Sequence, residues 1–183
     1  MLLSLVSVPA AAQPSPSPID TLMSRLAAVP TSRASFTEEK TIAALTEPVR
    51  SEGLLVYRRP DHLEKTTTAP NRESLMVDGD RLSIVADDQQ PRIIELDSEP
   101  SLRAMVYPVR GTLSGDLAAL RRSYDVAMQG TLAAWRLTLT PREQSLKQLL
   151  RQVTVEGTGT ELRAVRIVQA NGDQSSMTIR PAS

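Results

Sequence analysis

The only histidine of this chain, His62, directly follows Asp61. An aspartate–histidine pair can activate a serine nucleophile, so this is the first place to look for catalysis. No G-x-S-x-G motif supplies that serine, and the chain has neither a P-loop nor a G-x-G-x-x-G motif. A lone histidine at the start of a predicted strand is more often an ordinary surface residue. We therefore predict that the protein is not an enzyme and has no catalytic residues.

Two acidic pairs, Glu38-Glu39 and Asp87-Asp88, are the other groups that could act as acids and bases. Neighbouring residues on a strand point to opposite faces of the sheet, so a pair of this kind does not converge on one substrate. The sequence favours solvated positions, on a strand face or in a turn, for both pairs.

The composition excludes several kinds of binding site. The 183 residues include no cysteine and one histidine, which excludes thiolate and multi-histidine metal sites. Basic and acidic residues balance at 21 each, so there is no excess of positive charge to bind a phosphate backbone. We expect no metal, no cofactor and no nucleic-acid partner. A chain of this length favours one domain, which we expect to be a monomer.

The first residues resemble the end of a secretory signal peptide. Leu2 begins a short apolar run, and Ala10 and Ala12 supply the small residues of a cleavage site. No Lys or Arg precedes the run, which a start codon assigned too far downstream would explain. We predict a signal peptide, shortened at its start, in residues 1–12, a Pro/Ser tether in 13–18 and a single domain in 19–183.

Helical spacing of apolar residues occurs in two parts of the chain. The first is the segment 19–29, which follows Ser17 as the expected N-cap. The second lies between residues 98 and 123, where we expect a short helix that Pro108 ends and another that Ser114 caps. These amphipathic helices are available to cover a sheet.

The remaining segments show the period of two that is typical of antiparallel strands with one buried face. The clearest is 133–140, in which Trp135 and Leu137 share a face, and Asp78-Gly79 is a strong hairpin signal. We predict a mainly β domain with some α structure. It is a strongly curved, incompletely closed antiparallel β-barrel covered by short helices, with about five strands on either side of 98–123.

Four short motifs follow one another in the first half of the chain: Ser35-Phe36-Thr37-Glu38, Gly53, Arg59-Pro60 and Asp78-Gly79. Their order and spacing resemble the LolA family of periplasmic carriers, which bring lipoproteins to the outer membrane. In that family an SFTQ-like strand leads to a Gly-containing strand, an Arg-Pro corner and a DG hairpin. The resemblance extends from about Ile19 to Pro181 and implies the same curved, helix-covered sheet.

The resemblance also implies an apolar cavity between the sheet and the helices. Well-known family members carry several aromatics just after the DG hairpin, whereas this chain has aliphatic residues there. From the residues alone, the same apolar stripes fit an ordinary solid core, and this alternative stays open. The expected walls are Leu54, Val56, Leu75, Val77, Leu82, Ile84, Ile94, Leu96, Trp135, Leu137 and Leu139, and the expected lid is Leu102, Met105, Val106, Leu117 and Leu120.

A lid needs a contact that holds it shut and can be released. In the LolA family the arginine of the Arg-Pro corner does this by hydrogen bonds to the lid helix, and the resemblance assigns this role to Arg59. An arginine has five donors in a rigid fork and can satisfy several helix carbonyls at once. The alternative is a solvated arginine at a strand end, beside a proline that only stops strand pairing.

The function that the resemblance implies is that of a periplasmic carrier. It would bind the acyl chains of lipoproteins or other lipids, receive them from an inner-membrane transporter and move them toward the outer membrane, where the acceptor stays undefined. One alternative is a lipid-sensing envelope-stress module of the same fold, and another is a carrier of a non-lipoprotein acyl lipid for a dedicated exporter. A structural β domain with a solid core is the third.

Overall fold

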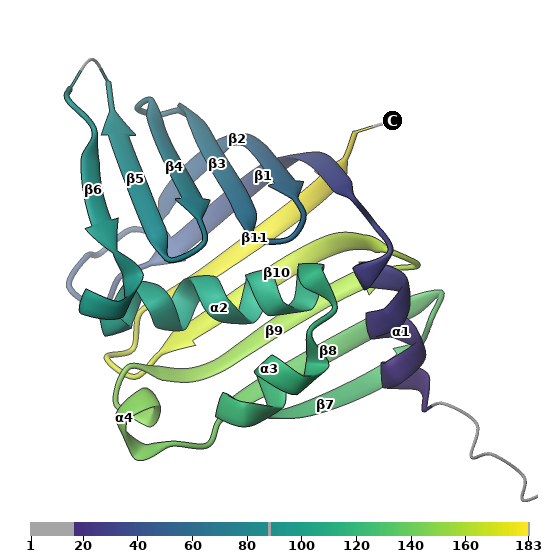
Figure 1. The fold of residues 1–183 in the computed structure, drawn as a ribbon. Helices are drawn as coiled ribbons and strands as arrows, with labels where there is room; N and C mark the ends of the chain where they lie inside the picture. The colour runs from purple at the N-terminus through teal and green to yellow at the C-terminus, as the bar shows by residue number, and fades with distance from the viewer. Residues whose placement is uncertain (1–16, 88, 183) are drawn as a thin grey trace, which may run out of the picture.

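The structure, a computed structural model, describes residues 17–87 and 89–182 and is dominated by one antiparallel sheet of 11 strands (Figure 1). The strands follow the sheet order β6-β5-β4-β3-β2-β1-β11-β10-β9-β8-β7. Their bounds are β1 (Thr31–Thr41), β2 (Val49–Arg58), β3 (His62–Ala69), β4 (Glu73–Asp78), β5 (Arg81–Ala86), β6 (Arg92–Glu95), β7 (Tyr124–Thr131), β8 (Ala134–Pro141), β9 (Leu150–Thr158), β10 (Glu161–Gln169) and β11 (Gln174–Pro181).

The pairing of β1 with β11 joins the N-terminal and C-terminal halves of the sheet. Its register runs from Ala34 opposite Pro181 to Thr41 opposite Gln174. The edge strands β6 and β7 stand at opposite ends of the sheet order, so the curved sheet is not closed into a barrel. The predicted mainly β, incompletely closed architecture is confirmed, with six strands before the central helices and five after them.

Helices cover the concave side of this sheet. Figure 1 shows α2 crossing between the two halves of the curved sheet, with α1 and α3 beside it over the C-terminal strands. An amphipathic helix and a one-sided sheet must bury their apolar faces against each other, which explains this layering. The bounds are α1 (Pro18–Ala27), the 3₁₀ helix η1 (Leu96–Ser98), α2 (Pro100–Ser114), α3 (Leu117–Ser123) and α4 (Gln144–Lys147).

The start of α1 matches the prediction. Ser17 is the N-cap, and its hydroxyl oxygen accepts a hydrogen bond from the Asp20 N–H at 3.3 Å. The buried face of the helix consists of Ile19, Leu22, Met23 and Leu26, and Leu22 and Leu26 are fully buried. The cap and the apolar face together fix where the helix begins and which side it buries.

The prediction that Pro108 ends a helix is wrong. The helix α2 continues through Pro108 to Ser114 and ends at Gly115, whose φ of +70° places it in the left-handed region. Pro108 is fully buried, and the hydroxyl of Thr112 donates to its carbonyl oxygen at 2.8 Å. Burial of the helix against the sheet outweighs the loss of one backbone donor. Asp116, rather than Ser114, caps α3.

The hairpin signal at Asp78-Gly79 is confirmed with its turn one residue later. Asp78 pairs with Arg81, so the two turn residues are Gly79 and Asp80. Gly79 has a φ of +57°, which glycine adopts without strain. This register places the carboxylate of Asp80 at the tip of the hairpin, within reach of Tyr107 in α2.

Two packed clusters occupy the concave side of the sheet, one in each half. The larger cluster joins α1 and α3 to the C-terminal strands, and its buried members include Leu22, Leu26, Leu120, Trp135, Leu137, Leu139, Leu150 and Val153. The smaller cluster joins the β4–β6 strands to η1 and consists of Val77, Leu82, Ile94 and Leu96, with Leu102 and Val106 of α2 against it.

The predicted signal peptide, residues 1–12, and most of the tether, residues 13–18, lie outside the described residues. In the part of the chain that the structure does describe, none of the helices combines the length and the apolar character needed to cross a membrane.

Candidate binding cavity

A cavity of about 700 Å³ lies over the central strands of the sheet and under α2, between the two packed clusters. This volume is within the usual range of small-molecule sites. The apolar lining comes from both layers: Leu26 and Val29 at the end of α1, Leu102, Met105, Val106, Val109 and Leu113 in α2, and Leu55, Leu75, Val77, Leu82, Leu162, Val165, Met177 and Ile179 in the sheet.

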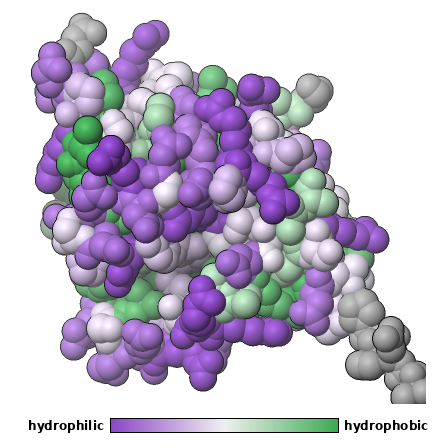
Figure 2. Space-filling view, viewed as in Figure 1, coloured by the Kyte–Doolittle hydropathy of each residue, from purple (hydrophilic) through white to green (hydrophobic). Residues whose placement is uncertain are grey.

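The cavity lies on the concave side of the curved sheet, and α2 lies across it (Figure 1). Figure 2 shows that the outer surface on this side is mostly hydrophilic, with hydrophobic residues in smaller patches between the hydrophilic ones. On this side of the molecule, the larger apolar groups thus lie beneath the surface, in the clusters and around the cavity.

The structure places part of the predicted site at this cavity. The lining includes Leu75, Val77, Leu82, Leu102, Met105 and Val106. Val56 also borders the cavity, although it shares the strand parity of the outward-facing Leu54. Alternation on β4 and β5 therefore identified the inward residues correctly. The same holds for the first turns of α2, although the predicted end of that helix was wrong.

Leu54 is a wrong prediction. Its side chain is 55% exposed, on the face of β2 opposite to that of the partly buried Leu55 and the buried Tyr57. The four consecutive apolar residues 54–57 do not reveal which pair faces inward. Pairing with β1, in which Leu55 lies opposite Ala34, sets the actual register.

The other predicted cavity residues belong to the packed clusters. Ile94 and Leu96 lie in the smaller cluster, and Ile84 packs against it. The larger cluster contains Leu120, Trp135, Leu137 and Leu139, and Leu117 packs against it. They do face inward, but the β8 residues among them are packed in one buried cluster with side chains of α1 and α3. The domain thus has a solid core in its C-terminal half, as the alternative interpretation predicted, and a cavity at its centre, as the resemblance predicted.

One end of the cavity is polar. Glu38 of β1 is only 6% exposed and forms an ion pair with Lys65 of β3. Its Oε1 accepts a hydrogen bond from the hydroxyl of Ser175 at 2.5 Å, and Lys40 Nζ lies 3.7 Å from its Oε2. The strand register gathers these groups, because Lys40 lies directly opposite Ser175 in the β1–β11 pair.

The charges of this group are interdependent. Burial raises the pKa of Glu38, but the ammonium groups of Lys65 and Lys40 and the bond from Ser175 outweigh it and leave that pKa below its ordinary value. Burial lowers the pKa of Lys65, and Glu38 offsets only part of this effect. Lys65 Nζ also lies 4.8 Å from the centre of the Phe36 ring, which favours its charged form.

Sequence reasoning missed this polar end. Glu38 and Glu39 were expected to be solvated, yet only Glu39 is exposed, where it pairs with Arg50 at 3.0 Å. The signal was the period of two in β1, because Ala34, Phe36 and Glu38 share the inward face. For the other acidic pair, Asp87 is exposed as expected, and residue 88 lies outside the described residues.

The hydrogen bonds that the resemblance assigned to Arg59 are not formed in the described part of the chain. The Arg59 side chain is exposed, and its backbone N–H donates to the Pro30 carbonyl at 3.0 Å. The Arg-Pro corner lies near the end of α1, where the Tyr57 hydroxyl donates to the Pro60 carbonyl at 3.2 Å. The corner therefore stabilises the connection after α1, and among the described residues its arginine side chain forms no hydrogen bond or ion pair with α2.

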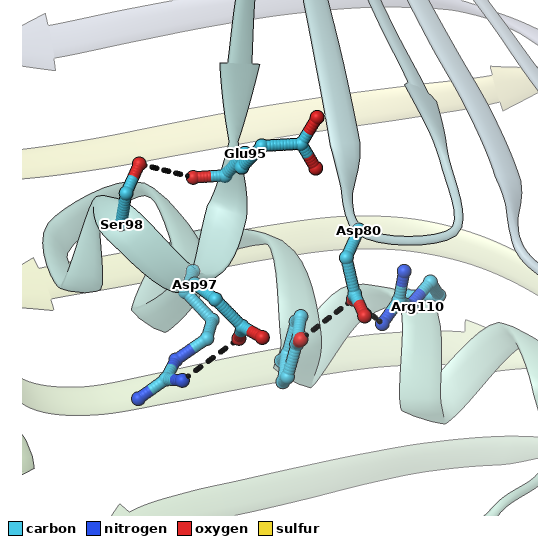
Figure 3. A network of polar contacts seen from close by, with 7 residues as sticks. Asp80, Glu95, Asp97, Ser98 and Arg110 are labelled. Atoms are coloured by element: carbon cyan, nitrogen blue, oxygen red, sulfur yellow. Dashed lines mark hydrogen bonds and ion pairs between the residues drawn. The ribbon is translucent and has the colours of Figure 1, made fainter.

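The contact that holds α2 comes from the helix itself and reaches the β4–β5 turn (Figure 3). The Tyr107 hydroxyl donates to Asp80 Oδ1 at 2.7 Å, and Arg110 donates to the Gly79 carbonyl and, at 3.4 Å, to Asp80 Oδ1. The bond from Tyr107 is the main reason that the pKa of Asp80 is lowered. Near the start of α2, Arg103 donates to Asp97 at 3.1 Å. We call the Asp80–Tyr107–Arg110 contacts the helix latch.

Replacing Asp80 by alanine should loosen α2. The latch is partly exposed, so its loss should weaken helix docking by roughly 1 kcal/mol and speed amide exchange within α2 several-fold. Hydrogen-exchange mass spectrometry of peptides from residues 100–114 measures this. Arg81→Ala is the matched control, because it removes the Arg81–Glu95 pair of the same hairpin without touching α2. Equal exchange in both variants would show that the latch does not hold the helix.

His62 is surrounded by charged groups. One ring nitrogen bonds the Asp78 carboxylate, and the other lies 2.9 Å from Arg58 and 3.9 Å from Glu64. Asp61, its sequence neighbour, is not its partner in these contacts. Within the described residues, no three His, Asp or Glu side chains are grouped so that they could hold a metal ion.

An open, curved antiparallel sheet with an apolar cavity under a helix defines a class of β domains with room for an apolar ligand. Within that class, this chain belongs to the outer membrane lipoprotein carrier protein LolA-like family, whose model matches residues 11–182. The resemblance inferred from the four sequence motifs is confirmed.

Solved structures give a distant likeness. A MucB structure aligns with a TM-score of 0.50 and 14% identity over 88% of this chain and 56% of that chain, which shows the fold alone. A Pseudomonas aeruginosa MucA/MucB complex aligns at 0.47 with 15% identity over 89% of this chain and 56% of that chain. A LolA superfamily protein from Nitrosomonas europaea aligns at 0.46 with 8% identity, over 92% of this chain and 95% of that chain. This chain thus spans just over half of the MucB chain. No curated protein matches it.

Proposed function

We propose that this protein is a periplasmic carrier that binds the acyl chains of lipoproteins or other lipids and passes them from an inner-membrane transporter toward the outer membrane. It acts without catalysis and without a cofactor. The observation that supports this most is the apolar cavity under α2, with membership of the LolA-like family behind it.

The lining suits an acyl chain. Burying a chain of about 16 carbons gains on the order of 12 kcal/mol relative to water. Met105 and Met177, one from the helix and one from the sheet, are flexible side chains that can repack around different chains.

A carrier must also release its cargo, so part of that gain has to be offset. Opening α2 to admit cargo breaks the latch contacts, and reclosing the empty protein restores them, which favours release. Tyr107 and Arg110 thus perform, in this proposal, the role that the resemblance gave to Arg59.

Native mass spectrometry of the full chain purified from a bacterial periplasm, followed by organic extraction, tests the proposal. We expect a co-purified acyl lipid or lipoprotein, or uptake of an added acylated peptide in a one-to-one complex. A protein that is free of lipid and takes up neither acylated peptide nor phospholipid would contradict the carrier function.

A further inference from the structure

Protein donors fill most of the acceptor positions on the buried carboxylate at the polar end of the cavity. Glu38 Oε1 accepts from Ser175 at 2.5 Å, and Oε2 is approached by Lys65, by Ser51 at 3.5 Å and by Lys40 at 3.7 Å. A carboxylate has about four lone-pair positions, and the donors of Ser175, Lys65 and Ser51 lie within hydrogen-bond distance of three of them.

Spare donors, in contrast, remain beside it. Each lysine ammonium has three N–H donors, and among the described residues Glu38 is the only ion-pair partner of Lys65 and of Lys40 within 4 Å. Lys65 is held over the Phe36 ring, so its amino group stays at the cavity wall. Two positive groups therefore share one carboxylate at this end.

Other acidic groups near this end are held elsewhere. Asp173 accepts bonds from the Ala43 N–H and from the Asn171 side chain, both at 2.9 Å. Glu64 lies beside His62 and accepts from Thr66 at 3.2 Å.

The charge of Glu73 reaches Lys65, but the described residues show no ion pair between these two side chains within 4 Å. Unused N–H donors thus remain on Lys65 and Lys40 at this end of the cavity.

We infer that the polar end is a head-group site and that the cargo carries an anionic head, a carboxylate or a phosphate, that binds Lys65 and Lys40. Its acyl chain then extends along the apolar part of the cavity beneath α2. The inference rests on the proposed function, because it requires that the apolar part holds an acyl chain.

This assignment also gives the buried ion pair a purpose. A buried ion pair is weak evidence for stability, because desolvation of the two charges offsets much of their attraction. Here Glu38 holds Lys65 in place. The second ammonium, that of Lys40, gives the group of three side chains one more positive than negative charge. A buried cation with a fixed position is suited to recognising an anion.

Titration of the full chain with hexadecanoate, hexadecyl phosphate and methyl hexadecanoate tests the inference by separating head from chain. Either anion should bind about tenfold more tightly than the uncharged ester, as expected for charge-assisted hydrogen bonds. The anion that binds more tightly shows whether the site prefers a carboxylate or a phosphate head group. Equal affinity for acid and ester would overturn the head-group site and leave the carrier function standing. If none of the three probes binds, the result contradicts the proposed carrier function and therefore also the head-group site.

Substitutions of single residues test whether Lys65 and Lys40 cause the preference for anion over ester. Lys40→Met, at a half-exposed side chain, should lower the preference for anion over ester several-fold, and Lys65→Met should abolish it. Glu38→Gln should strengthen anion binding several-fold, because it removes the competing carboxylate. Lys147→Met, in α4 and outside the cavity lining, is the control and should change nothing. A preference unchanged in Lys40→Met and Glu38→Gln, both folded, would overturn the assignment.

Discussion

Replacing Ala34 by tryptophan should lower the affinity for an acylated peptide by on the order of a hundredfold. Ala34 is a small, half-buried residue on the inward face of β1, and it lines the cavity opposite Leu55. An indole at this position occupies space that the acyl chain would use. Excluding about four methylene groups removes roughly 3 kcal/mol of binding free energy.

The neighbouring variant Ser35→Trp is the matched control. Ser35 lies one residue further along the same strand, is exposed on the opposite face and does not line the cavity. It adds the same side chain without filling the space under α2. Titration with a fluorescent acylated peptide measures both variants, with thermal unfolding as the check on folding. Equal affinities in two folded variants would mean that the acyl chain binds elsewhere.

The second large effect is expected in the packed half of the domain. Leu137 of β8 is fully buried between the sheet, α1 and α3. Replacing it by alanine leaves a void and should lower the free energy of unfolding by about 2–5 kcal/mol. Urea unfolding followed by circular dichroism measures the change.

Leu54→Ala provides the comparison for that result. The side chain is the same, but it is more than half exposed on the convex face of β2, so its loss should change stability by about 0.5 kcal/mol or less. A large loss in Leu54→Ala, or a small one in Leu137→Ala, would contradict the inward and outward faces that the structure assigns.

The sequence was sufficient to predict the fold because its local signals agree with one another. The cap at Ser17, the alternation on β8 and the hairpin at Gly79 each specify an element, and short connections then favour an antiparallel sheet. The family motifs gave the same architecture independently. Pro108 and Ser114 are the exceptions, because tertiary burial carries α2 through Pro108 to Ser114 and overrides both local signals.

The site was harder to predict, for physical reasons. Inward-facing residues look alike in sequence whether helices fill the space above them, as at Trp135, or leave it open, as at Leu75. On β2, the uninterrupted apolar run of residues 54–57 does not show which alternate side chains face inward, which explains the error at Leu54. Glu38 was missed because acidic residues on strands are usually exposed, and only the three-dimensional contact with Lys65 makes its burial favourable.

The central claim is that an acyl chain lies between the sheet and α2, and photo-cross-linking tests it most directly. An acylated peptide with a photoreactive group near the end of its chain is bound to the full-length protein, irradiated and mapped by mass spectrometry. The account predicts adducts on α2 around Met105 to Leu113 and on Val165 or Met177 of the facing strands. Adducts confined to the convex face around Leu54, or no adduct despite binding, would contradict it.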